Sequence, residues 1–291
     1  FEGQLYYNSS DGQFKFIGLG TGTWASAPAL NTARRYPGGT GIQKSAICIA
    51  GQNYPSFYVL TEEYDGTSWT EVGDLSTGRG RLASGGTATA AFAAAGNMGP
   101  PGDTNSAEKW NGSSWTSAGT VNTARGNLAG AGSNTAAIAF GGNPSPAFTE
   151  IYNGSSWSET SDLNTGRTAL AGNGTSTAGW AAGGGSPGAN VETFNGSSWT
   201  EVGDMNTGRG YLAGFGTTTS AIVMGGGSPP PKTALTELFN GTSWTEVGDL
   251  GTAIKYLASA GADSSSGRTM LGSTGGPPDG TAVNTSEEWT K

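Results

Sequence analysis

One sequence motif recurs along this chain and constrains its fold more than any other feature. It is clearest as FNGSSWTEVGDMNTGRGYLAGFG from Phe194 to Gly216, and near-copies begin at Tyr64, Trp110 and Tyr152. Each copy carries a marker tryptophan, and successive markers are 45, 46, 42, 42 and 45 residues apart. The markers are Trp24, Trp69, Trp115, Trp157, Trp199 and Trp244. A repeat of roughly 40–50 residues built of short strands predicts a β-propeller. We expect Trp69, Trp115, Trp157, Trp199 and Trp244 to be mostly buried between adjacent blades.

Each repeat contains four short strands, which we name a to d in chain order. Strand a follows an arginine, as in GYLAG from Gly210, and strand b is an apolar run such as SAICIAG from Ser45. Strand c ends on an aromatic residue, and strand d starts at the marker tryptophan five residues later. Asn-Gly or Asp-Gly between c and d favours a tight hairpin, because both residues tolerate positive φ. Each repeat therefore predicts one four-stranded antiparallel blade.

The two ends of the repeat array complement each other. Strand-c aromatics define six repeats, and the last repeat stops at Trp289 without a strand d. Residues 20–34, GTGTWASAPALNTAR, align with NGSSWTSAGTVNTAR from Asn111, which includes a strand d. We therefore predict an all-β, six-bladed propeller over residues 20–291, closed by residues 20–32 as strand d of the C-terminal blade. Closure leaves no unpaired inner edge.

Residues 1–19 do not fit the repeat. The segments LYYN and QFKFI flank a turn at SSDG, which predicts a hairpin extension ahead of the propeller. The chain begins with Phe rather than Met, which we interpret as a trimmed or partial chain.

These features resemble the kelch-repeat family of β-propellers. The resemblance spans residues 20–291 and rests on the double glycine after strand b (Gly141-Gly142 and Gly225-Gly226), the strand-c aromatic, the marker tryptophan and the following arginine. The Asn-Gly-Ser-Ser-Trp motif, with the segment GQLYYNSSDGQFKF ahead of it, also resembles sequences of kelch-like proteins and fibre modules of tailed bacteriophages. The resemblance implies the architecture, while propellers of this kind serve as enzymes, lectins and interaction modules.

Composition removes several classes of function. The net charge of −8 argues against nucleic-acid binding, which needs a basic face. No apolar run approaches the ~18 residues of a membrane span, so no membrane insertion is expected. There is no histidine and one cysteine, Cys48, which lies in an apolar run and is expected to be a buried small hydrophobe. We expect no metal and no cofactor, and a surface rich in Ser, Thr, Asn and Gly because only 12% of residues are charged.

The enzymes among propellers of this kind need residues that this sequence lacks. Galactose oxidase needs histidine ligands for its copper, and none is present. Sialidase propellers carry Asp-box turns, to which Asp65-Gly66-Thr67-Ser68-Trp69 is faintly similar, but those turns are structural there too. We therefore expect that the chain is not an enzyme.

A glutamate and an arginine recur at fixed places in the repeat. The glutamates lie two residues before the strand-c aromatic, and the arginines follow strand d; the sixth arginine position is Ile254. They are Glu62, Glu108, Glu150, Glu192, Glu237 and Glu287, with Arg34, Arg79, Arg125, Arg167 and Arg209. The simplest interpretation is a structural ion pair in each blade interface but one, where Lys255 would substitute if it turned inward. An array of catalytic carboxylates is the alternative, although six equal copies provide no distinct acid and base.

The b–c loops differ from blade to blade and share one face with the d–a connections. Candidate binding residues on that face are Tyr54, Phe57, Tyr58 and Phe148 in the loops, and Arg35, Tyr36, Lys255 and Tyr256 near the connections. Aromatic side chains there would suit stacking on sugars or packing against protein, and the alternative is that the loops are merely tolerant of change. Sequons such as Asn153-Gly-Ser lie in the c–d turns, where turn chemistry explains them better than glycosylation.

These observations favour a non-enzymatic propeller displayed outside cells, on a phage particle as a fibre, whisker or surface-decoration protein. Its task would be attachment to a host-surface glycan or to another virion protein. The competing class is a secreted bacterial lectin or adhesin, and an enzyme comes third. Because the b–c loops differ, one protein-docking surface is favoured over six equal sugar sites.

Overall fold

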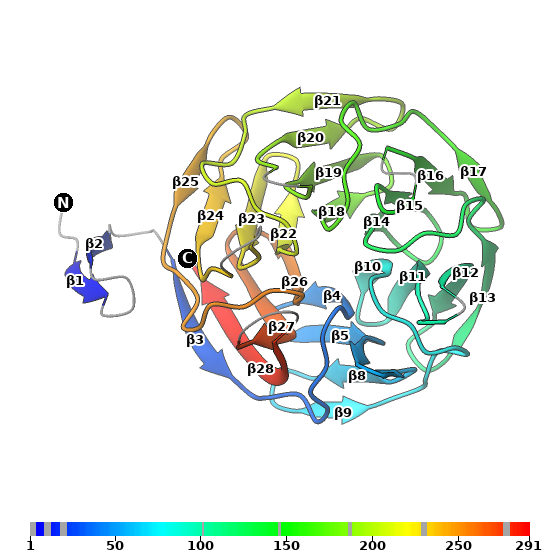
Figure 1. Cartoon of the computed structure of the whole chain (residues 1–291), viewed down its shortest axis with the longest axis horizontal. Helices are drawn as coiled ribbons and strands as arrows, with labels where there is room; N and C mark the ends of the chain where they lie inside the picture. Colours follow the sequence, from blue (N-terminus) through cyan, green and yellow to red (C-terminus); the bar gives the residue numbers. More distant parts are fainter. Residues whose placement is uncertain are drawn as a thin grey trace.

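The six-bladed propeller is confirmed by a computed structural model. The structure describes residues 4–8, 13–17, 22–100, 102–144, 147–185, 188–227, 232–275 and 280–291, the first two ranges as backbone only. Six four-stranded antiparallel sheets surround a central axis, each with its strands in the order a, b, c, d from the centre outward (Figure 1). Two further two-stranded sheets are β1 (Gln4–Asn8) with β2 (Gln13–Ile17), and β6 (Gln52–Asn53) with β7 (Ser56–Phe57).

The first three blades follow the chain in order. Blade 1 comprises β4 (Gly38–Ile42), β5 (Ser45–Ile49), β8 (Thr61–Tyr64) and β9 (Trp69–Glu71). Blade 2 comprises β10 (Ala83–Thr87), β11 (Ala90–Asn97), β12 (Asp103–Trp110) and β13 (Trp115–Thr120). Blade 3 comprises β14 (Ala129–Gly132), β15 (Ala137–Phe140), β16 (Thr149–Tyr152) and β17 (Trp157–Glu159).

The last three blades continue the circle, and the sixth combines both ends of the array. Blade 4 comprises β18 (Ala171–Thr175), β19 (Ala178–Ala182), β20 (Val191–Phe194) and β21 (Trp199–Val202). Blade 5 comprises β22 (Ala213–Thr217), β23 (Ser220–Met224), β24 (Thr236–Phe239) and β25 (Trp244–Glu246). Blade 6 comprises β26 (Ala258–Asp263), β27 (Ser266–Thr274), β28 (Thr281–Thr290) and, from the other end of the chain, β3 (Thr23–Ala27).

The closure predicted from the sequence is confirmed by the pairing of β3 with β28. The strands are antiparallel with Trp24 opposite Trp289, and the two indole rings lie 5.4 Å apart. Beyond β3, the backbone N–H of Leu30 donates to the carbonyl of Asn284, and the side-chain amide of Asn284 donates to the carbonyl of Leu30, both at 2.9 Å. In Figure 1 the blue β3 accordingly lies beside the red β28.

Most marker tryptophans are buried between neighbouring blades. Trp69, Trp157, Trp199 and Trp244 are only 5–6% exposed, whereas Trp24 and Trp115 are half-buried. The exceptions occur in the two blades whose strand c ends on tryptophan, at Trp110 and Trp289, both fully buried. A larger strand-c ring fills the space that Tyr or Phe leaves in the other four blades. The expectation that Trp115 is mostly buried therefore overlooked the size of its partner.

The c–d turns are built by their Asn or Asp side chains. Asn153 Oδ1 accepts hydrogen bonds of 3.0 Å from the backbone amides of Ser155 and Ser156. Asp65 occupies the same place in blade 1, and hydrogen bonds led by the Thr67 hydroxyl lower the pKa of its carboxyl to about 2. This geometry accounts for the repeated sequons by turn formation.

Glycines near the end of strand a allow it to approach strand b closely. Gly132 has φ +108°, and a Cβ there would lie 2.3 Å from the carbonyl oxygen of Ala136. The same close approach occurs in four other blades, at Gly41, Gly86, Gly174 and Gly216. A Cβ at this position would meet the backbone of strand b, so only glycine fits there in these five blades.

We expect Gly132→Ala to destabilise the protein more than Gly119→Ala. Both glycines have positive φ, but a Cβ at Gly119 would meet no atom within 4 Å. Gly119→Ala should therefore cost only the backbone strain, on the order of 1–3 kcal/mol. Gly132→Ala adds a steric conflict worth roughly another 1–3 kcal/mol. Denaturant unfolding of the two variants measures the difference, and equal losses would contradict the close contact.

Candidate binding site on the loop face

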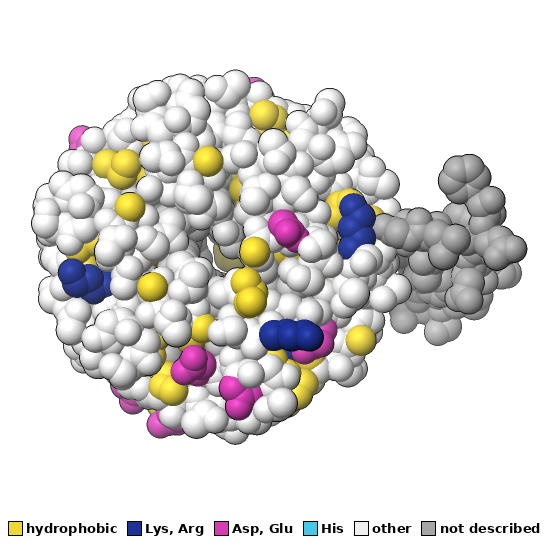
Figure 2. Space-filling model, turned by 180° about the vertical axis from the view of Figure 1, so that it is seen from behind, with side chains coloured by type: hydrophobic (Ala, Val, Ile, Leu, Met, Phe, Trp, Pro, Cys, Tyr) yellow, Lys and Arg dark blue, Asp and Glu magenta, His cyan; other side chains and the backbone are white. Residues whose placement is uncertain are grey.

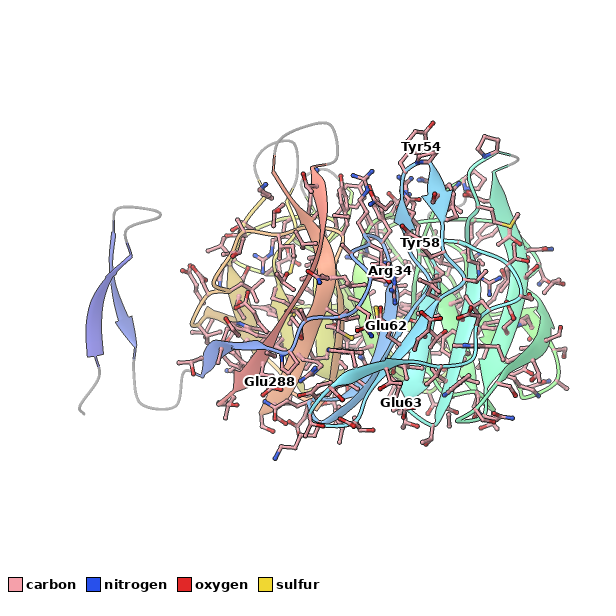
Figure 3. All side chains as sticks on the ribbon, turned by 90° about the horizontal axis from the view of Figure 1, so that it is seen from below. Arg34, Tyr54, Tyr58, Glu62, Glu63 and Glu288 are labelled. Carbon is pink, nitrogen blue, oxygen red and sulfur yellow. The ribbon has the colours of Figure 1, made fainter. Side chains whose placement is uncertain are left out.

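Five arginine–glutamate pairs join five of the six d–a connections to strand c of the blade that follows. The guanidinium–carboxylate distances are 2.6 Å for Arg34–Glu62, 3.1 Å for Arg79–Glu108, 3.2 Å for Arg125–Glu150, 2.6 Å for Arg167–Glu192 and 2.6 Å for Arg209–Glu237. The same carboxylates accept backbone N–H groups of the connection, as Glu62 does from Asn31 at 2.6 Å. Figure 3 shows Arg34 and Glu62 inside the blade, below Tyr54. These buried pairs join blades and present nothing to a ligand.

Burial and ion pairing shift the pKa of these arginines in opposite directions. Burial lowers the pKa of the Arg79, Arg167 and Arg209 guanidinium groups, while the facing carboxylate raises it. Removing that carboxylate would leave a cation in a dry interior, which is the costliest state for such a group.

The interface before blade 6 lacks this pair, because Ile254 occupies the arginine position. Glu287 instead accepts the backbone N–H of Gly251 at 2.8 Å, and burial raises the pKa of its carboxyl. Lys255 does not substitute, since its Nζ lies 4.4 Å from the ring of Tyr256. Blade 6 has a different ion pair, between Arg268 and Glu288, and the Arg268 guanidinium lies 3.4 Å from the Tyr64 ring of blade 1. Sequence reasoning missed Arg268, whose position is not repeated.

We define the loop face as the face that carries the b–c loops and d–a connections. Among its described residues, one aromatic side chain is strongly exposed. Tyr54 is 72% exposed at the tip of the β6–β7 hairpin (Figure 3). Phe57 packs against Gly99 of the next b–c loop, and Tyr58 and Phe148 are half-buried. Five of the six b–c loops contain residues outside the described ranges.

Six residues around the central axis form a closed ring of backbone hydrogen bonds. Each lies two residues after the arginine position and has φ between 56° and 63°. Each backbone N–H donates to the carbonyl of the equivalent residue in the preceding blade, at 2.7–3.0 Å. The residues are Tyr36, Arg81, Asn127, Ala169, Tyr211 and Tyr256, which we call the axial ring. The ring holds six side chains around the central axis.

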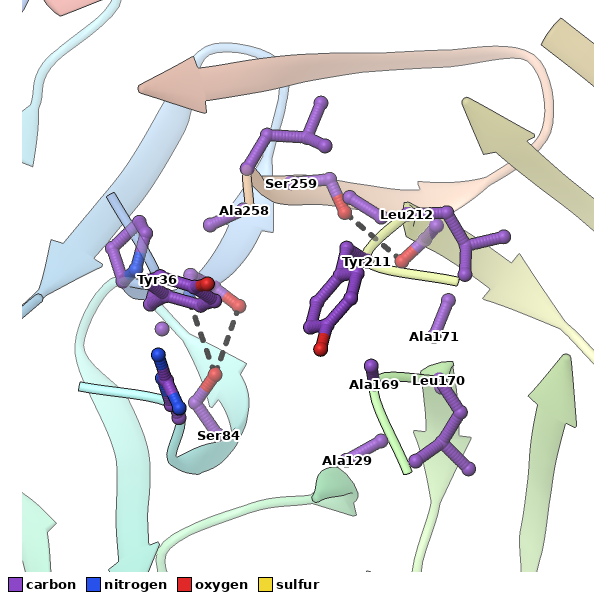
Figure 4. Close-up of a pocket in the computed structure, with 18 of the residues that line it drawn as sticks. Tyr36, Ser84, Ala129, Ala169, Leu170, Ala171, Tyr211, Leu212, Ala258 and Ser259 are labelled. Carbon is purple, nitrogen blue, oxygen red and sulfur yellow. Dashed lines mark hydrogen bonds between the residues drawn. The ribbon is translucent and has the colours of Figure 1, made fainter. Parts of the chain in front are cut away.

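The axial ring has two unlike halves. Tyr36 and Tyr256 are stacked with ring centroids 4.0 Å apart, and Tyr211 meets both edge-on. The other half consists of Arg81, Asn127 and Ala169. A cavity of about 120 Å³ lies at the axis, lined by ring residues and the starts of the inner strands. Figure 4 shows Tyr36 and Tyr211 directed into this space, whereas Ala169 contributes only a methyl group.

The structure brings together only part of the predicted binding set. Tyr36 and Tyr256 meet at the axis with Lys255 beside them, whereas Arg35 is buried and donates to the carbonyl of Gly280 at 3.1 Å. Sequence reasoning missed the other four ring members, Arg81, Asn127, Ala169 and Tyr211. Their shared spacing from the arginine position, as in Arg209-Gly210-Tyr211, was the available signal.

The chemistry of the site is that of recognition groups. The described cavity lining has tyrosine, arginine, asparagine and serine side chains but no carboxylate, imidazole or thiol. No cluster of three potential metal-ligating side chains occurs within the described ranges. Cys48 is buried in blade 1, and burial raises the pKa of its thiol to about 12.

Figure 2 shows the opposite face of the propeller. That face is mostly uncharged polar surface with scattered charges and a hollow at its centre. In the described part of the chain, no helix has the length and apolar character needed to cross a membrane. No protein-family model matches this chain, and no curated protein sequence matches it significantly.

Proposed function

We propose that this chain is a non-enzymatic attachment propeller of the kelch-like type, displayed on the outside of a virus particle. It would serve as a fibre, whisker or decoration protein and bind through the loop face to a host-surface glycan or to another virion protein. Two observations support an extracellular setting: the resemblance of the repeat sequences to bacteriophage fibre modules, and the surface with few charges.

The observation that carries this proposal is the concentration of recognition groups on one face. Tyr54 protrudes from the loop face, and the axial ring opens there with its tyrosines and Arg81. Aromatic and arginine side chains dominate recognition surfaces, because they bury much area at a low entropy cost. With no acid–base pair in the described lining, binding is the role that the groups present support.

Particle attachment tests the proposal. Antibodies against the propeller are expected to label intact particles purified from the source culture, and excess soluble propeller should reduce particle adsorption to host cells several-fold. Tyr54→Ala should weaken this competition, because it removes the exposed ring. The matched control is Ile42→Ala, which removes an apolar side chain that is 48% exposed at the far end of an inner strand.

The location of the protein decides between the alternatives. Propeller found free in the culture fluid and absent from particles would contradict the virion assignment and favour the secreted lectin or adhesin. Competition that is equally strong for both variants would contradict the loop-face assignment.

A further inference from the structure

Arg81 differs from every other described arginine in having no acceptor. Six arginines pair with glutamates, and Arg35 donates to a backbone carbonyl. Within the described ranges, the Arg81 side chain has neither a hydrogen-bond nor an ion-pair partner, and its Nε is shielded from solvent. Its guanidinium lies 4.3 Å from the centre of the Tyr36 ring, which fixes its position. A partly buried guanidinium without a counter-ion favours the binding of an anionic group from a ligand.

The neighbours of Arg81 in the axial ring extend this polar site. Asn127 follows Arg81 in the ring, and Ala169 follows Asn127. Tyr211 lies across the ring from Arg81, and neither its hydroxyl nor the Asn127 amide has a hydrogen-bond partner among the residues that the structure describes. All three polar residues are partly exposed. The small Ala169 leaves the gap that a ligand would fill.

We propose that the axial ring binds, between Arg81, Asn127 and Tyr211, one saccharide unit that bears a carboxylate, as in a uronic or sialic acid. Arg81 and Asn127 would hold the carboxylate, and the Tyr211 hydroxyl would form hydrogen bonds with the sugar hydroxyls. Charge-assisted hydrogen bonds of this kind are roughly twice as strong as neutral ones. This inference rests on the proposed attachment function and names its ligand.

Cavity size and asymmetry both favour a single sugar residue. The cavity, at about 120 Å³, is smaller than the roughly 300–1,000 Å³ pockets of drug-sized ligands. It therefore suits a terminal unit better than a length of chain. Because the axial ring holds a single arginine and a single asparagine, it has one such site rather than six. A single site is consistent with b–c loops that differ from blade to blade.

Calorimetric titration with free sugars tests the proposal. Glucuronate, galacturonate and N-acetylneuraminate are the probes, and glucose and galactose are the neutral controls. At least one acidic sugar should bind wild type about tenfold or more tightly than the neutral sugars, and Arg81→Ala should remove that difference. Ala169 already holds the same backbone conformation at φ 59°, so alanine is tolerated at this position. Lys44→Ala removes an equal charge from the exposed turn between β4 and β5 and should change nothing.

A second variant blocks the site without removing charge. Ala169→Tyr should abolish acidic-sugar binding by filling the gap, and tyrosine already occupies this conformation at Tyr36, Tyr211 and Tyr256. An unchanged melting temperature for both variants shows that the fold is retained. Sugar binding that survives Arg81→Ala and Ala169→Tyr would overturn the proposal, as would no preference for acidic sugars.

The adsorption assay distinguishes failure of the saccharide site from failure of the attachment function. If wild-type propeller competes for host cells but Arg81→Ala competes equally well, the attachment function stands and the saccharide site falls. If an acidic peptide binds in an Arg81-dependent way while the sugars do not, the ring is a protein-docking site and the saccharide proposal is wrong.

Discussion

Deleting residues 1–32 is expected to open the propeller and leave a chain that aggregates or unfolds near ambient temperature. The deletion removes β3, which pairs along five residues with β28, and it removes Leu30, which is 1% exposed. Losing a buried leucine or a large aromatic side chain costs roughly 2–5 kcal/mol. That is comparable with much of a typical net stability of about 5–15 kcal/mol. The unpaired edge of β28 would also become a template for association.

Deleting residues 1–21 is the matched control, since it spares β3 and its contacts. This shorter deletion should leave the melting temperature and the monomeric state unchanged. Size-exclusion chromatography and thermal unfolding of both truncations provide the measurement. A monomeric 1–32 deletion with the wild-type melting temperature would show that β3 does not close the ring.

Breaking one buried ion pair is expected to have the second-largest effect. Glu237→Gln leaves Arg209 almost fully buried without a counter-charge, since both side chains are only 1–2% exposed. Removing one partner of a buried pair typically costs about 3–5 kcal/mol. Replacing both partners by apolar residues, in Arg209→Met with Glu237→Leu, should recover much of that loss, because no charge remains buried.

Glu287→Gln is the control within the same fold. Glu287 occupies the equivalent place but faces no arginine, and its half-buried carboxyl has a raised pKa because burial opposes its charge. Glutamine keeps the acceptor for Gly251, so the loss should be within about 1 kcal/mol. Denaturant unfolding compares the variants, and equal losses at Glu237 and Glu287 would contradict the latch role of the arginines.

The sequence predicted those features of the fold that are repeated. The tryptophan period, the Asn-Gly turns and the alignment of residues 20–34 were enough to predict six blades and their closure. The Glu–Arg latch was also predictable, because both partners recur at fixed places. Glu62 and Arg34, for example, reappear in register four more times as bonded pairs.

The candidate site was largely hidden because it depends on the differences between repeats. Arg81, Asn127 and Tyr211 become neighbours only once six blades close a ring, and their left-handed backbone is stabilised by hydrogen bonds across blades. Trp115 is half-buried beside the fully buried Trp110, a difference from the other blades that the repeat pattern alone did not predict. Position in the repeat revealed where such residues lie, while their contacts required the closed structure.

Closure is the central claim, since the axial ring exists only if the chain closes on itself, and an engineered disulfide tests it most directly. Thr23 and Thr290 are exposed and directly opposite each other on β3 and β28. Cysteines placed at both positions are expected to form an intramolecular disulfide in the monomer under mild oxidation, and to raise the melting temperature. The control joins Thr23→Cys with Thr116→Cys on β13 of blade 2, which should give no such bond. Failure of the first pair to cross-link, or cross-linking only between molecules, would contradict the closed six-bladed ring.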